Sequence, residues 1–448
     1  AVTATSGDIT DSGTLTITGA SIFTTRVGGS NIVLDSSANA FAAAVTMKAD
    51  TAGNETFGNI TFVDSGAVKL HTSAGTDGDL FIDANPDGVA AVGGNLSITA
   101  RAGDITQSLA VTVTGTSSFT TLTNNRTITL SNTGNAFAGA VTLSTTGSSA
   151  HATLDNGTAN IDLDTSSIGG NLTLTSGAAT SGSNYAIMDS GTVTVGGNLI
   201  ATTDANSGVI NLGTLAVDGT MALTTDTGGA ATVVNDAGIN FATSTVRGAL
   251  SATATAGNII DTGALTITGT STFVTIANDA TITLDQGGHA FTGALLITTN
   301  DTSTDTAGDV TISAGSSAVL DFGNSTIDGD LIATSSNATG ITDSGAMTVR
   351  GTASFRTTAT NADISLGTST LGDGTGTDTI TLNTTGSTGN ATLDNGTTAV
   401  ALGTSADSLV TSVGGNLTLT SGAAAGITDS ATVTVGGNLV ATTNDNDG

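Results

Sequence analysis

Along this sequence, apolar residues alternate with Thr and Ser around a small residue that recurs every few tens of residues. The stretch GDITDSGTLTITGASIF, from Gly7 to Phe23, returns with few changes at Gly103, Gly257 and Gly340. Self-similarity at a period of ~20–50 residues is typical of solenoids and other repeat architectures. We therefore expect the chain to be built from many copies of one small structural unit.

Each copy is anchored on a small residue, usually Gly. The anchors Gly94 and Gly115 lie 21 residues apart, and the anchors Gly293 and Gly329 lie 36 apart. Two residues before every anchor the side chain is apolar, and apolar residues dominate two and four residues after it. This period-two alternation predicts short β-strands with one buried face.

One unit of this size cannot bury its apolar face alone, so successive units must stack and hydrogen-bond to each other. The predicted fold is therefore all-β: a parallel β-helix (β-solenoid) of roughly 19 coils of about 20–30 residues each, with no distinct helical domain. The 61 Gly residues supply corners, and the single Pro suits strands whose N–H groups are all needed.

Longer segments are duplicated as well. GGNLTLTSGAA occurs at Gly169 and Gly414, and ATLDNGT occurs at Ala152 and Ala391, which are separations of 245 and 239 residues. We expect one continuous solenoid over residues 1–448, with an internal duplication of approximately 1–205 and 250–448.

Both ends of the sequence lie inside a repeat. AVTATSGDITDSG at Ala1 matches SATATAGNIIDTG at Ser251, and GGNLVATTNDNDG at the other end stops partway through a motif. The sequence is therefore expected to be a fragment of a longer chain.

An Asp or Asn recurs eight residues before the anchor. The column contains Asp11, Asp35, Asp162, Asp189, Asn211, Asn240, Asp261, Asp285, Asp321, Asp343 and Asp429. The preferred interpretation is a corner position, where such side chains bond the backbone of the next turn. The alternative is Ca²⁺ binding, because Asp side chains on adjacent rungs repel each other unless a cation lies between them.

Asp11 with Asp35, and Asp261 with Asp285, are the candidate Ca²⁺ pairs. The calcium-binding nonapeptide GGxGxDxUx is missing from the sequence. No cofactor is therefore expected, and Ca²⁺ is the one candidate ion.

Residues that carry catalytic chemistry do not cluster. His71, His151 and His289 have no partner at metal-ligand spacing, and His289 takes the place of Asn39 and Asn135 in the NAF motif, as a corner variant would. Lys and Arg together number 8, scattered along the chain, and Trp is missing, whereas a sugar-cleaving site needs convergent charges and aromatic platforms. No catalytic or cofactor-binding residue is assigned, and the chain is expected not to be an enzyme.

The net charge of −29 argues against nucleic acid and anionic membrane surfaces as partners. No apolar run approaches the ~20 residues of a membrane-spanning helix. The expected partners are neighbouring segments of the same chain and, beyond these, other fibres, cell surfaces or glycans.

The runs ITDSGTLTITG, NAFAGAVTL and GGNLTLTSGA resemble the repeat regions of very large bacterial surface exoproteins, the filamentous-haemagglutinin-like adhesins and related β-strand-repeat proteins. The resemblance covers essentially the whole chain. It implies that the β-helix is right-handed and forms a shaft on, or shed from, a Gram-negative-type cell surface.

The leading functional prediction is a structural or adhesive shaft of a secreted or cell-surface bacterial fibre. Alternatives are a self-assembling extracellular filament subunit, a carbohydrate-active β-helix enzyme, and an ice-binding solenoid that uses Thr-x-Thr ladders such as TLTIT.

Overall fold

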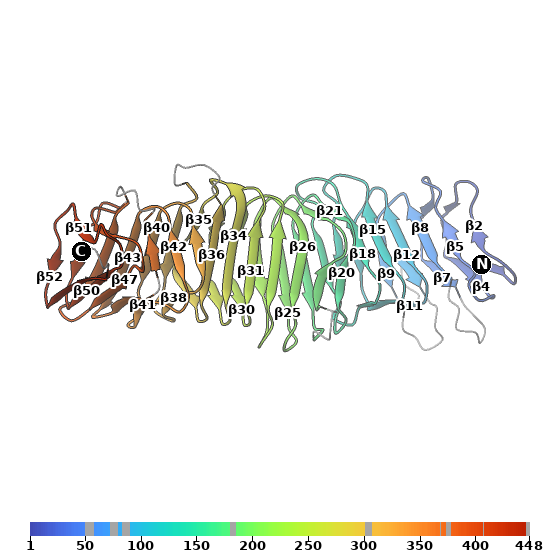
Figure 1. Cartoon of the computed structure of the whole chain (residues 1–448). Coiled ribbons are helices and arrows are strands. Elements are labelled where there is room, and N and C mark those ends of the chain that lie inside the picture. The colour runs from blue at the N-terminus through green and yellow to red at the C-terminus, as the bar shows by residue number, and fades with distance from the viewer. Residues whose placement is uncertain are drawn as a thin grey trace. The chain divides into compact units, whose positions relative to one another are not determined.

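A computed structural model describes residues 1–49, 58–71, 79–82, 90–179, 185–300, 307–367, 369–372, 378–405 and 407–444. The regular structure of these residues is entirely β, and the strands pair in parallel from one coil to the next (Figure 1). The predicted all-β parallel β-solenoid is confirmed. It has about 17 turns rather than roughly 19, because several long gaps between anchors contain half-turns instead of further whole coils.

The chain divides into two compact units, Ala1–Gly229 and Ala230–Gly448. Each unit is a stack of coils, and most coils contribute one long strand, mostly of five residues, followed by two short strands. In β26 (Ile210–Val217) and β35 (Ile282–Phe291) the two following strands are joined into one. No helix in the described part of the chain is long and apolar enough to cross a membrane.

In the first unit the long strands are β1 (Val2–Ala4), β4 (Ser21–Thr25), β7 (Val45–Ala49), β8 (Ile60–Asp64), β12 (Leu96–Ala100), β15 (Ser117–Thr121), β18 (Val141–Ser144), β19 (Ala152–Asp155), β22 (Leu172–Ser176), β25 (Leu199–Thr203) and β27 (Thr220–Thr224). The others are β2 (Ile9–Thr10), β3 (Thr16–Ile17), β5 (Ile32–Leu34), β6 (Ala40–Phe41), β9 (Val68–His71), β10 (Asp79–Ile82), β11 (Ala90–Val92), β13 (Ile105–Gln107), β14 (Val111–Val113), β16 (Ile128–Leu130), β17 (Ala136–Phe137), β20 (Ile161–Leu163), β21 (Ser166–Ile168), β23 (Ile187–Asp189), β24 (Val193–Val195) and β26 (Ile210–Val217).

In the second unit the long strands are β28 (Ala231–Asn235), β31 (Leu250–Ala254), β34 (Ser271–Asn278), β36 (Leu295–Asn300), β37 (Val310–Ala314), β40 (Leu331–Ser335), β43 (Ala353–Thr360), β46 (Ile380–Thr385), β47 (Ala391–Asp394), β50 (Leu417–Ser421) and β53 (Leu439–Thr443). The others are β29 (Ile239–Phe241), β30 (Ser244–Val246), β32 (Ile259–Asp261), β33 (Leu265–Ile267), β35 (Ile282–Phe291), β38 (Leu320–Phe322), β39 (Ser325–Ile327), β41 (Gly340–Asp343), β42 (Met347–Val349), β44 (Asp363–Leu366), β45 (Ser369–Leu371), β48 (Val400–Leu402), β49 (Ser412–Val413), β51 (Ile427–Asp429) and β52 (Thr434–Val435).

The alternation in the sequence sets which face of each strand is buried. In β22 the side chains of Leu172 and Leu174 are fully buried, whereas Thr173 and Thr175, which alternate with them, are partly exposed. Successive side chains of a strand point to opposite faces, so the apolar residues enter the core and the Thr residues face solvent.

Neighbouring coils pair in strict register. Leu172 of β22 lies opposite Leu199 of β25, and Thr175 lies opposite Thr202. The core side chains therefore form continuous columns along each unit.

Aromatic rings join strands across the core. In the first unit the rings of Phe119 (β15) and Phe137 (β17) lie 5.7 Å apart in an edge-to-face arrangement. In the second unit Phe322 (β38) and Phe355 (β43) pack edge to face at 6.3 Å. All four are fully buried, so strands of different sheets enclose a common core within each unit.

The long strands do not stay on one side of this core. We call the two large sheets the first and the second wall. In the first unit the first wall contains β4 and β7, and the next four long strands belong to the second wall: β8, β12, β15 and β18. The four long strands after these return to the first wall: β19, β22, β25 and β27. In the second unit β28, β31, β34 and β36 share a wall with β47, β50 and β53, while β37, β40, β43 and β46 share the other.

Candidate functional site

Part of the predicted Asp column lies at the ends of short strands and bonds to the next coil, as Asp11, Asp189 and Asp343 do. The corner interpretation is wrong for four other members, which lie inside strands: Asp162, Asn211, Asn240 and Asp321. The Oδ1 atom of Asp11 accepts the N–H of Asp35 at 3.1 Å, and its Oδ2 atom accepts the N–H of Ser36 at 3.3 Å and the side-chain amide of Asn39 at 2.7 Å. Burial raises the pKa of Asp11, but these donors outweigh that effect, and the pKa of this carboxyl lies below its ordinary value.

Other members of the column use the same type of contact. The two oxygens of Asp189 accept the N–H groups of Gly213 and Thr214 at 2.8 and 2.7 Å. Asp343 accepts the N–H of Gly367 at 2.8 Å. These carboxylates therefore tie corners of adjacent coils together, as Asx side chains do in turns.

The candidate Ca²⁺ pairs are adjacent but do not form an assembled ligand set. Asp261 accepts the N–H of Asp285 at 3.0 Å, as Asp11 does from Asp35. Calcium takes 6–8 oxygen ligands, and the described residues contain no group of three or more His, Asp or Glu arranged to hold a metal. Ca²⁺ binding at this column stays a prediction.

His289 lies at the same corner as the Asn residues that it replaces in the motif. The side-chain oxygen of Asn39 accepts the N–H of Leu15 at 2.8 Å, and its amide donates to Asp11. In the same way, Nδ1 of His289 accepts the N–H of Leu265 at 3.0 Å.

The other nitrogen of His289 lies beside a carboxylate. Nε2 lies 3.4 Å from Oδ2 of Asp261, and both side chains are fully buried. Because Nδ1 accepts a hydrogen bond, the proton of the neutral ring resides on Nε2. Nε2 lies close to the carboxylate of Asp261 but makes no hydrogen bond with it. The imidazole thus supplies the acceptor that the side-chain oxygen of Asn39 supplies, without reproducing its donated bond.

Burial controls the charge of this pair. Desolvation lowers the pKa of His289 to about 4, although the negative charge of Asp285 acts in the opposite direction. Desolvation also raises the pKa of Asp261. The imidazole is therefore neutral at physiological pH and acts as a hydrogen-bonding corner residue.

A second set of polar contacts, which was not predicted from the sequence, lies at the start of the long strands. Oδ1 of Asn171 accepts the N–H of Asn198 at 2.9 Å, and Oδ1 of Asn198 accepts the N–H of Thr220 at 2.9 Å. Nδ1 of His151 caps this ladder by accepting the N–H of Asn171 at 2.9 Å. The sequence signal for this ladder was the Asn that directly follows the paired Gly in GGN motifs. Of the three His residues, His71 has a side chain that lies outside the described residues.

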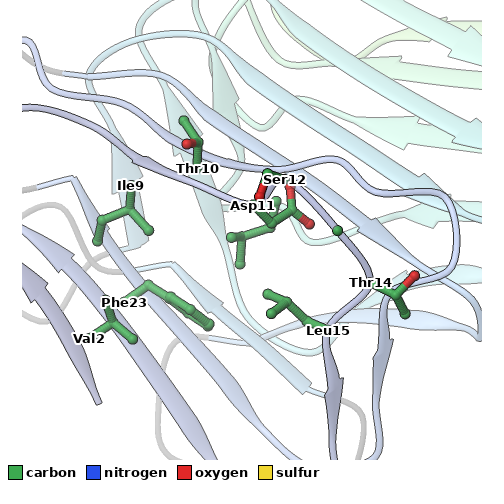
Figure 2. Close-up of a pocket in the computed structure, with 10 residues that line it drawn as sticks. Val2, Ile9, Thr10, Asp11, Ser12, Thr14, Leu15 and Phe23 are labelled. Atoms are coloured by element: carbon green, nitrogen blue, oxygen red, sulfur yellow. The ribbon is translucent and has the colours of Figure 1, made fainter.

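A hollow of about 400 Å³ opens at the first coil (Figure 2). Core-type side chains, among them Ile9, Leu15 and Phe23, line it together with the Asp11 corner. Asp11 is the one ionisable residue in this lining, and its oxygens are already hydrogen-bonded.

No solved structure and no curated protein matches this chain. A family model described as repeats of unknown function matches four stretches, residues 1–48, 57–144, 228–298 and 307–370, which together make up more than half of the sequence. The chain with these stacked coils and bonded corners therefore belongs to the family of repeats of unknown function DUF5649.

Proposed function

We propose that this chain is a non-catalytic structural shaft of an adhesive fibre on a bacterial cell surface. The observation that carries the proposal is the in-register parallel pairing of long strands within each unit, for example β12 with β15 over all five residues from Leu96↔Ser117 to Ala100↔Thr121. Such pairing satisfies the backbone along the stack and gives the coils a stiff, cumulative core.

The chemistry of the corners supports a role without catalysis. The carboxylates of Asp11, Asp189 and Asp343 are occupied by N–H groups of the next coil. A group that holds the fold together in this way is a poor general base, because the same lone pairs would have to accept a substrate proton.

Charge and motif content support the location. A net charge of −29 keeps a long repetitive protein soluble and disfavours self-association by repulsion. The resemblance of ITDSGTLTITG and NAFAGAVTL to adhesin repeats adds the bacterial surface as the expected setting.

The spacer role can be tested on beads. The full chain is attached to a bead by one end and carries biotin at the other, and capture by streptavidin beneath a polymer brush is measured. A matched bead carries a flexible Gly/Ser linker of about 200 residues, because a flexible linker of equal residue number would reach further than coils stacked about 4.8 Å apart. Greater capture through the folded chain supports the shaft, and capture equal to that of the linker contradicts it.

The adhesive role needs a separate assay. Beads that carry the chain without biotin are applied to a glycan array and to cultured cell surfaces, with beads carrying the Gly/Ser linker as the control. Binding above the control supports adhesion, and its absence would leave the spacer role alone. Glycan cleavage by the purified chain would contradict a non-catalytic shaft.

A further inference from the structure

In two connections that the structure describes in full within one unit, a long strand directly follows another long strand, with no short strands between them. Residues 145–151 connect β18 to β19 in the first unit, and residues 386–390 connect β46 to β47 in the second. The chain thus makes a half-turn instead of a full coil, and the next long strand lies on the opposite wall.

The pairing partners record this switch. Before the half-turn, β18 stacks on the long strand β15, with Phe119 opposite Leu143. After the half-turn, the strands that stack next on β18 are the short strands β20 and β21, and Val141 lies opposite Leu163. On the other wall β19 stacks on the short strand β16.

A buried Asn marks each of these half-turns. Oδ1 of Asn156 accepts the N–H of Phe137 at 2.7 Å, and Nδ2 of Asn156 donates to the carbonyl of Phe137 at 3.0 Å. Asn395 makes the same two contacts with Leu371, at 2.7 and 3.1 Å. Both Asn side chains are fully buried.

The geometry explains why an amide is needed there. In a complete coil the next short strand supplies these bonds; for example, the N–H of Ala138 donates to the carbonyl of Val113. A half-turn omits that strand, so the N–H and C=O of Phe137 would be buried without partners. The side-chain amide of Asn156 takes the place of the missing peptide group.

Most boundaries of the family match lie where one long strand directly follows another. The matched stretches end at residues 48, 144 and 298, at the close of β7, β18 and β36, and new stretches begin at residues 57, 228 and 307, just before β8, β28 and β37. The fourth stretch ends at residue 370, inside β45 and before the half-turn that follows β46.

We propose that the unit of this family is a module of four long strands that ends in a half-turn. Residues 152–224, which the family model does not match, form one further module, and residues 391–444, also unmatched, contain three long strands of another. Their shared ATLDNGT and GGNLTLTSGAA motifs occupy equivalent strands, β19 with β47 and β22 with β50. Within each unit, successive modules present their long strands on opposite walls.

This inference deepens the shaft proposal but does not depend on it. If the outward faces of the long strands form a binding surface, a partner bound to this surface on one module finds the equivalent surface of the next module on the opposite wall. The motif SIFTT of β4 lies on the first wall, and its equivalent SSFTT of β15 lies on the second.

The test uses pairs of introduced cysteines, because the sequence contains none. In the full chain Ser144 lies opposite Ser167, so the pair Ser144→Cys and Ser167→Cys forms a disulfide under mild oxidation. The pair Thr142→Cys and Thr173→Cys does not, because these residues lie on opposite walls. The reverse of either result in the full chain overturns the proposal.

A deletion then removes the half-turn together with β19. Removing residues 145–155 joins Ser144 to Asn156 and keeps the native connection from Asn156 to β20. β22 is then placed directly on β18, and the pair Thr142→Cys and Thr173→Cys now forms a disulfide. A folded deletion variant that does not form it overturns the proposal, and the full-chain pairs decide the question if the variant does not fold.

Discussion

The side-chain amide of Asn156 contacts both backbone polar groups of Phe137, accepting its N–H at 2.7 Å and donating to its carbonyl at 3.0 Å. One side chain thus replaces one rung of a β-ladder. The arrangement predicts a local cost when the amide is removed.

Replacing Asn156 with Leu leaves the N–H and C=O of Phe137 without partners, and each buried unsatisfied group costs about 1–3 kcal/mol. We expect local stability to fall by about 2–5 kcal/mol around β17 and β19. Hydrogen exchange of the Phe137 amide measures the effect. Asn198→Ala, at an exposed ladder position, is the matched control and is expected to change local stability by less than about 1 kcal/mol. Equal effects of the two substitutions would contradict the role of Asn156 as the partner of the Phe137 backbone groups.

Asp64 occupies the equivalent position at the end of β8 and accepts the N–H of Phe41 at 3.2 Å. Burial raises its pKa, although N–H donors act in the opposite direction. A carboxyl with a raised folded-state pKa favours folding as the pH falls through that value and opposes it at neutral pH. Asp64→Asn should therefore stabilise this region at pH 7 by about 1 kcal/mol and flatten its pH dependence.

That change is measured by hydrogen exchange of the Phe41 amide at pH 7 and at acidic pH. Asp8→Asn, at an exposed corner, serves as the control. Lower protection in Asp64→Asn at pH 7 would show that the carboxylate is the better partner.

His289 gives the chain an acid-sensitive corner. Its pKa is lowered to about 4 by burial, whereas the ordinary value is 6.5. The unfolded state therefore takes up the proton first, and stability falls as the pH drops from the ordinary value towards 4. The loss between pH 7 and pH 5 should be about 2 kcal/mol.

The substitution His289→Asn restores the residue used at Asn39 and should remove most of this loss. Exchange of the Leu265 amide at pH 7 and pH 5 reports it, since that N–H donates to Nδ1 of His289. The raised pKa of Asp261 opposes the loss at still lower pH. An unchanged pH response in His289→Asn would assign the effect to other groups.

Core and surface positions of one strand should respond very differently. Leu174→Ala opens a cavity in the core and is expected to cost about 2–5 kcal/mol in the coils around β22. Thr173→Ala, on the outer face of the same strand, should stay within about 0.5 kcal/mol. Because each coil contacts its neighbours alone, exchange should increase near β22 and not in distant coils.

The sequence predicted the coil well because the coil depends on local alternation. The apolar residues around Gly170 and Gly197 identify β22 and β25 and their buried faces. The path of the chain was less accessible, because ATLDN at Ala152 reads as one more long strand. Those five residues do not indicate that two short strands are missing before β19, because this is a property of the whole coil and not of the local sequence.

The polar contacts divide in the same way. The Asp column was visible because it recurs at a fixed distance from the anchor, and the structure places Asp11 and Asp189 at bonded corners. The role of Asn156 was hidden, since its partner Phe137 lies in the preceding coil and is identified by pairing alone.

The account depends most on the parallel register of successive coils, and a pair of disulfides measures it. Thr175 and Thr202 lie opposite each other, and the strand spacing of about 4.8 Å suits a disulfide. The full chain with Thr175→Cys and Thr202→Cys should oxidise readily, whereas Thr173→Cys with Thr202→Cys, about 8 Å apart by strand geometry, should not. Equal oxidation of the two pairs, or preference for the second, would contradict the stacked-coil structure.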